Sequence, residues 1–153
     1  MKWVKSAITG LVGSLVMFII MTVGINVTGI APFNIPPSAA FLYTLGLNIG
    51  PLPVIVHFSY GIFWSVALYF FLKDNVSIKN GIYLAIALWA FMMIVLSPII
   101  GWGPFGFGSA NKLAVDSPLY LETGPKYLIM TLLLHLIYGS IIGWGNGQIG
   151  SNE

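Results

Sequence analysis

The chain contains no cysteine and no arginine, and only 7% of its 153 residues are charged. The absence of cysteine excludes disulfides, thiolate metal ligands and cysteine nucleophiles. A net charge of +2 is too small to indicate a nucleic-acid partner. The acids are few and scattered, and the sequence has no carboxylate pair, no Ser–His–Asp grouping and no phosphate-binding loop. We therefore expect no enzymatic activity.

What the chain has instead is apolar surface: 58% of its residues are hydrophobic and its mean hydropathy is +0.93. A soluble domain carries roughly 25% charged residues, so the composition predicts an integral membrane protein. About 20 apolar residues are needed for a helix to cross a bilayer. Four runs meet this requirement without an acid or a lysine, and they span residues 7–27, 53–72, 81–100 and 127–145. The predicted fold class is an all-α, four-helix transmembrane bundle.

The first run follows Lys2 and Lys5 and so resembles a signal peptide. Its apolar stretch is too long for that, and no clear Ala-x-Ala site follows it, so we interpret it as a retained helix. Lys73 and Lys79 lie in the short connection between the second and third runs. Because lysine concentrates on the cytoplasmic side, both termini and this connection are predicted to be cytoplasmic. The expected location is the prokaryotic inner (cell) membrane, with a multi-pass topology.

The only two histidines each open the same five-residue pattern, His-x-x-Tyr-Gly, in the second and fourth runs. Positions i, i+3 and i+4 of a helix share one face, and polar groups within a bilayer usually face protein or a cavity. The pattern therefore predicts a site, whose candidate binding residues are His57, Tyr60, Gly61, His135, Tyr138 and Gly139. A small residue follows each glycine by four positions, Ser65 and Gly143. Close helix packing is the favoured interpretation of these small residues.

The repeated pattern also divides the single domain, residues 1–153, into two helical hairpins, residues 1–73 and 80–147. Each hairpin has two spans, so the hairpins share one orientation and form a parallel repeat. The connections within the hairpins, residues 25–52 and 101–126, are predicted to be extracytoplasmic. A short helix is expected from residue 36, and Pro98 is expected to kink or end the third span. The aromatic residues of the segment 101–108 suit the headgroup layer.

These motifs resemble an uncharacterised family of small, four-span prokaryotic membrane proteins. The resemblance lies in a glycine-rich first span, His57-Phe58 with Gly61, Pro98 with Gly101, and His135 with Tyr138 and Gly139. It covers nearly the whole chain and implies the four-span architecture. It implies no activity, because the family has none established.

Haem b is the most specific ligand to consider, since a membrane bundle can hold it by two imidazoles from facing helices. His57 and His135 are the only pair available, and they would be the haem-iron ligands. Against haem, one group near one face would not carry electrons across the bilayer. The plainer alternative is that each neutral imidazole bonds a backbone carbonyl or a hydroxyl group. Another metal or a quinone is a third alternative. Met17 and Met21 can bind Cu(I), but methionine more often fills irregular apolar gaps.

The leading functional hypothesis is a non-catalytic accessory or structural subunit of a larger membrane complex, such as one of an electron-transfer chain. Its partners would be the lipid bilayer and other membrane subunits, or further copies of the chain. The alternative is a haem b-binding membrane protein ligated by His57 and His135. A small transporter or channel is the second alternative, and it would need a polar stripe through all four spans. The threonines and serines are too scattered to show one.

Overall fold

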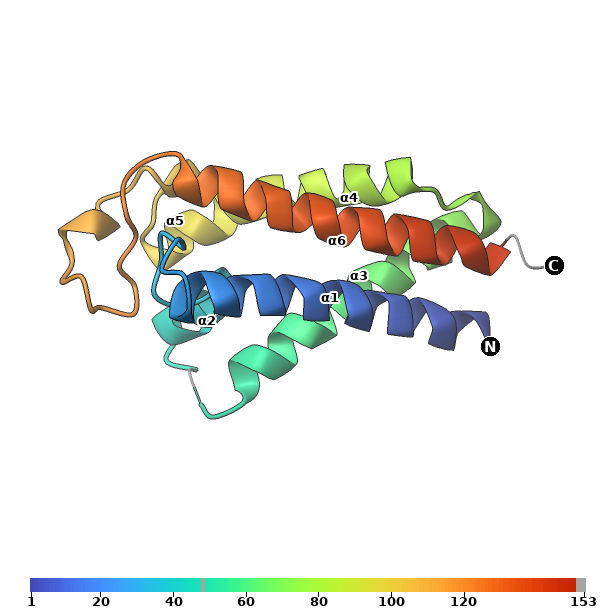
Figure 1. Ribbon diagram of the computed structural model, residues 1–153, viewed down its shortest axis with the longest axis horizontal. Helices are drawn as coiled ribbons and strands as arrows, with labels where there is room; N and C mark the ends of the chain where they lie inside the picture. The colour runs from blue at the N-terminus through green and yellow to red at the C-terminus, as the bar shows by residue number, and fades with distance from the viewer. Residues whose placement is uncertain (48, 151–153) are drawn as a thin grey trace.

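Four long apolar helices make up the body of the protein in a computed structural model, which describes residues 1–47 and 49–150 (Figure 1). The apolar spans cover Lys2–Asn26, Leu52–Asn75, Ile78–Ile100 and Lys126–Ile149. The corresponding elements are α1 (Lys2–Asn26), α3 (Leu52–Leu72), α4 (Ile78–Phe91) with its continuation, and α6 (Lys126–Gly150). The all-α, four-helix bundle is confirmed, and each span corresponds to one of the predicted runs.

The third span changes its winding before it ends. After α4, residues Met92–Leu96 form a π-helical turn, and α5 (Ser97–Ile100) completes the span. The backbone N–H of Ser97 donates to the carbonyl of Met92, five residues back. This wider turn accommodates Pro98, which lacks an N–H and would crowd an α-helical turn before it. The helix therefore continues past the proline and ends at Gly101, whose φ of 93° suits glycine.

Within each hairpin, the two helices meet through glycine. A Cβ atom added at Gly10 of α1 would lie 2.7 Å from the carbonyl oxygen of Gly61 and from the Cβ atom of Ser65, both on α3. In the second hairpin, Gly81 of α4 takes the equivalent place against Gly139 and Gly143 of α6. The small residues therefore allow close backbone packing, and they do so in the same way in both hairpins.

The two hairpins are not joined symmetrically. Helix α1 packs along α6, so that the helices follow the order α3, α1, α6, α4. The pair equivalent to α1 and α6 is α4 and α3, and these two helices barely touch. Figure 1 shows α3 running obliquely away from α4 toward the end of the bundle that carries the long connections. We call the packed interface between α1 and α6 the closed seam, and the gap between α3 and α4 the open seam.

The end with the long connections, here called the loop end, is covered by structure of its own. The expected short helix is present as α2 (Pro37–Thr44). The two long connections join where Phe33 pairs with Leu121. Trp102 lies beneath them with no exposed surface, and its indole N–H donates to the carbonyl of Leu119 at 2.9 Å. The ring of Trp102 therefore fills the core under the two long connections.

A polar cluster connects three helices toward the opposite end of the bundle, where α1 begins and α6 ends (Figure 1). The hydroxyl of Ser6 donates to the carbonyl of Ser65 at 3.1 Å, and the hydroxyl of Ser65 donates to the carbonyl of Ser6 at 2.8 Å. The side-chain amide of Asn146 donates to the hydroxyl oxygen of Ser65 at 3.0 Å. All three side chains are fully buried. The cluster therefore links α1, α3 and α6 without any charged group.

Candidate functional site

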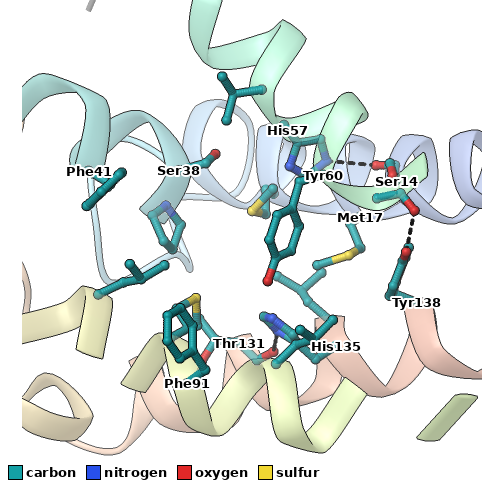
Figure 2. A pocket seen from close by; sticks show the side chains of 18 residues that line it. Ser14, Met17, Ser38, Phe41, His57, Tyr60, Phe91, Thr131, His135 and Tyr138 are labelled. Atoms are coloured by element: carbon teal, nitrogen blue, oxygen red, sulfur yellow. Dashed lines mark hydrogen bonds between the residues drawn. The ribbon is translucent and has the colours of Figure 1, made fainter. Parts of the chain in front are cut away.

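The open seam between α3 and α4 leads into a cavity of about 340 Å³, which is lined by residues of α1 to α4, the π-helical turn and α6. Both imidazoles and both tyrosine rings of the repeated pattern lie at this cavity (Figure 2). Five of the six predicted site residues therefore line one space: His57, Tyr60, Gly61, His135 and Tyr138. The two histidines, one from α3 and one from α6, therefore border one cavity from different helices.

His57 reaches from α3 to α1. Its Nε2 atom lies 3.0 Å from the carbonyl oxygen of Ser14. A carbonyl oxygen can only accept, so Nε2 is the ring nitrogen that carries the proton in this hydrogen bond. The rings of Phe18 and Phe58 lie 5.8 Å and 5.3 Å from the imidazole centroid. These contacts hold the ring in place and leave Nδ1 with a lone pair.

His135 is held within its own helix. Its Nδ1 atom lies 2.8 Å from the carbonyl oxygen of Thr131, one turn earlier in α6. By the same reasoning Nδ1 carries the proton, and Nε2 is left with the lone pair. The hydroxyl oxygen of Thr131 also accepts the indole N–H of Trp89 from α4 at 3.1 Å. Thr131 therefore orients the imidazole through its carbonyl group and links α6 to α4 through its hydroxyl group.

The two tyrosines of the pattern have different surroundings. Tyr138 is buried, and its hydroxyl donates to the carbonyl of Gly61 on α3. Tyr60 is 43% exposed, and its ring extends from α3 into the space between the two imidazoles (Figure 2). The difference arises from the seams, since Tyr138 lies at the closed side of the bundle and Tyr60 at the open one. One tyrosine therefore fastens the helices together, while the other borders the opening.

The two glycines of the pattern also separate. Gly61 lines the cavity and packs on the side chain of Ser14. Gly139 lies in the interface with α4, where an added Cβ atom would be 2.6 Å from the Cβ atom of Ala85. Its place in the structure is therefore that of a packing residue between two helices.

The remaining wall is almost entirely carbon and sulfur. Thioethers come from Met17, Met21 and Met92, and aromatic rings from Phe41 and Phe91. The lining residues include no acid and no lysine. Phe91 on α4 is 50% exposed and, like the exposed tyrosine on α3, borders the gap. A cavity of this kind can take an apolar molecule directly from the surrounding lipid and can hydrogen-bond it at the two imidazoles.

Bis-imidazole haem ligation normally uses the Nε2 atoms. His135 meets this requirement, since its Nε2 is free of the bond to Thr131. His57 does not, because its Nε2 is the atom bonded to the carbonyl of Ser14. Ligation by both residues would require the imidazole of His57 to turn and leave that carbonyl. Among the described residues, no group of three or more histidine, cysteine or acidic side chains could hold a metal ion.

Sequence reasoning missed the two residues that fix the imidazoles. Thr131 could have been found, because it lies four residues before His135 and therefore on the same face of α6. Ser14 could not have been assigned in this way, because its carbonyl meets His57 across an interface between helices.

The comparisons with known proteins add no relative to this description. The chain matches no protein-family model, and neither the curated proteins nor the solved structures include a match. The family resemblance stated above therefore stays a prediction, and the functional argument depends on the cavity alone.

Proposed function

We propose that this chain is a non-catalytic, integral membrane accessory subunit that binds a small apolar ligand taken from the bilayer. The observation that carries the proposal is the cavity of about 340 Å³ at the open seam. Its size lies within the range of small-molecule sites, roughly 300–1,000 Å³, which are mostly apolar with a few placed polar groups. The two imidazoles are those polar groups.

The proposed route of entry is lateral. A ligand dissolved in lipid would pass between α3 and α4, where Tyr60 and Phe91 are both half-exposed. Polar substrates have no corresponding path, since the wall offers them only two imidazoles and a few hydroxyl groups. Burying unpaired polar groups in such a wall is costly. The site therefore favours molecules that already partition into membranes.

The first experiment tests occupancy with two neighbouring substitutions on α3. Val56 lines the cavity, whereas Ile55 is 54% exposed and does not line it. Val56→Trp would fill the cavity, and Ile55→Trp adds the same ring on the lipid side. The wild-type protein and both variants would be isolated in lipid nanodiscs, and bound small molecules would be extracted and quantified by mass spectrometry.

We expect one small molecule per chain, in excess of its abundance in the surrounding lipid, for the wild-type protein and for Ile55→Trp. Val56→Trp should lose it. A wild-type protein without an enriched molecule would contradict the proposed ligand-binding function. Retention of the molecule by Val56→Trp would place it elsewhere on the protein.

The accessory-subunit part of the proposal is supported by the small size of the extramembrane structure and by the apolar body. Its test is the native mass of the protein extracted from its own membrane without dispersing the complexes. A larger assembly of fixed stoichiometry is expected, composed of other membrane subunits or of further copies of the chain. A bare monomer would contradict this part and leave ligand binding unaffected.

Haem b is the second candidate ligand, because His57 and His135 line the same cavity. An absorbance spectrum of the protein from its native membrane would show a low-spin Soret band. Either His57→Ala or His135→Ala should remove the low-spin signature, since each substitution deletes one axial ligand. A native protein without the band would exclude this candidate.

A further inference from the structure

We infer that the cavity selects a lipid-soluble aromatic diol, a hydroquinone with an apolar tail, over the oxidised quinone and over the corresponding diether. The inference rests on the proposed ligand-binding function and specifies the ligand class. It follows from the positions of two protons on the imidazoles.

The single N–H group of each neutral imidazole already donates a hydrogen bond within the protein. His57 uses Nε2–H for the carbonyl of Ser14 at 3.0 Å, and His135 uses Nδ1–H for the carbonyl of Thr131 at 2.8 Å. The other nitrogen of each ring has a lone pair and no proton, because a neutral imidazole donates once and accepts once. A second proton would make each ring a cation in an apolar wall without an acid to pair with it, which is costly.

A ligand that bonds both rings must therefore supply two protons. Figure 2 shows the imidazoles on opposite sides of the cavity, one from α3 and one from α6. A hydroquinone has two O–H donors at opposite ends of a flat ring. A quinone has two carbonyl acceptors at the same places, so its oxygens would face the lone pairs of His57 and His135. The hydroxyls of Ser38 and Tyr60 also line the cavity, but a hydroxyl can donate or accept and does not distinguish the two forms.

The rest of the wall suits a flat ring and a tail. The thioethers of Met17, Met21 and Met92 and the ring of Phe41 line the same cavity as the imidazoles. Sulfur and aromatic groups make favourable contacts with an aromatic ring. The tail would leave through the open seam into lipid, past Phe91. The ligand binds without any covalent bond being made or broken.

The test compares three ligands that share one decyl tail and one ring: decylhydroquinone, decylbenzoquinone and the dimethyl ether of decylhydroquinone. The ether keeps the ring and the tail of the diol and replaces both O–H donors by O–CH3 groups. Dissociation constants would be measured by isothermal titration calorimetry on the wild-type protein in nanodiscs, without oxygen, with empty nanodiscs as the reference for partition into lipid.

We expect the hydroquinone to bind at least tenfold more tightly than either of the other ligands, because a site with unpaired polar groups rejects analogues that cannot pair them. His57→Phe and His135→Phe keep a flat ring and remove the acceptor, so each should reduce the preference at least threefold. Ile55→Phe is the control, since Ile55 does not line the cavity, and it should leave the ratio unchanged.

Binding of the ether within threefold of the hydroquinone would overturn the inference, and so would the absence of binding by all three ligands. In either case the enriched molecule found in the occupancy experiment would still support the proposed function. Because the decisive comparison uses the wild-type protein, poor folding of a histidine variant would not affect it.

Discussion

The contact between Gly139 and α4 allows a quantitative prediction. A Cβ atom placed on Gly139 would lie 2.5 Å from the carbonyl oxygen of Gly81 and 2.6 Å from the Cβ atom of Ala85. Ordinary van der Waals contact begins at 3.4 Å. Gly139→Ala would therefore force α6 and α4 apart by roughly 0.9 Å, and a gap of that size forfeits a quarter to a half of the dispersion attraction between facing atoms. Because the obstacle includes backbone, a rotamer change cannot relieve it.

Overpacking of this kind costs about 1–3 kcal/mol. Alanine has a higher helix propensity than glycine by about 1 kcal/mol in water, which opposes the loss without cancelling it. The net loss is therefore smaller than the packing loss alone, and we expect Gly139→Ala to lower the free energy of unfolding by about 1–2 kcal/mol. The measurement is reversible unfolding in mixed micelles of rising SDS content, followed by tryptophan fluorescence.

The matched control is Gly24→Ala, on α1. There the nearest atom to an added Cβ is the terminal methyl carbon of Met130 at 3.0 Å, and the next is 3.7 Å away. A flexible methionine can move, so this variant should be as stable as the wild-type protein or slightly more so. Equal stability of Gly139→Ala and the wild-type protein would refute the argument that the hairpin is held by close backbone contact.

Two further predictions concern other parts of the bundle. Reporter fusions at Lys79 and at Asp116 should report opposite sides of the membrane, with Lys79 in the cytoplasm. The lysines at the start of α1, directly after α3 and at the start of α4 favour that side. A cytoplasmic signal at both sites would contradict this topology. Asn146→Leu should cost less than about 1 kcal/mol of unfolding free energy. Its side-chain amide donates to the hydroxyl oxygen of Ser65 at 3.0 Å and, more weakly, to the carbonyl oxygen of Ser65 at 3.4 Å, and a side-chain hydrogen bond in a bilayer is worth about 0.6 kcal/mol. The buried Oδ1 atom of Asn146 has no hydrogen-bond partner to lose. A loss well above this value in the same SDS assay would show that the polar cluster holds the three helices together more strongly than we expect.

The spans and the short helix α2 could be predicted because they follow from local properties, namely run length, charge and proline position. The packing role of the small residues could be predicted for the same reason. Their partners could not: the same spacing places Gly61 against α1 and Gly139 against α4, and nothing in either pattern specifies which helix lies opposite.

The cavity itself was beyond prediction. Two identical patterns suggest two identical environments, yet Tyr138 is buried and Tyr60 is half-exposed. The difference depends on α3 diverging from α4, and this divergence is a property of the whole bundle. For the same reason the sequence indicated a related pair of histidines, but it did not indicate which nitrogen of each ring bonds a backbone carbonyl.

The unequal seams have an evolutionary consequence. In a chain built from two like hairpins, only one of the two equivalent seams has to hold the halves together. Residues where α1 faces α6 are therefore constrained because they hold the two hairpins together. Residues where α3 faces α4 do not have this constraint. Related chains should diverge fastest at the residues that border the gap, such as Tyr60 and Phe91, and a change of ligand could accumulate there without a change of fold.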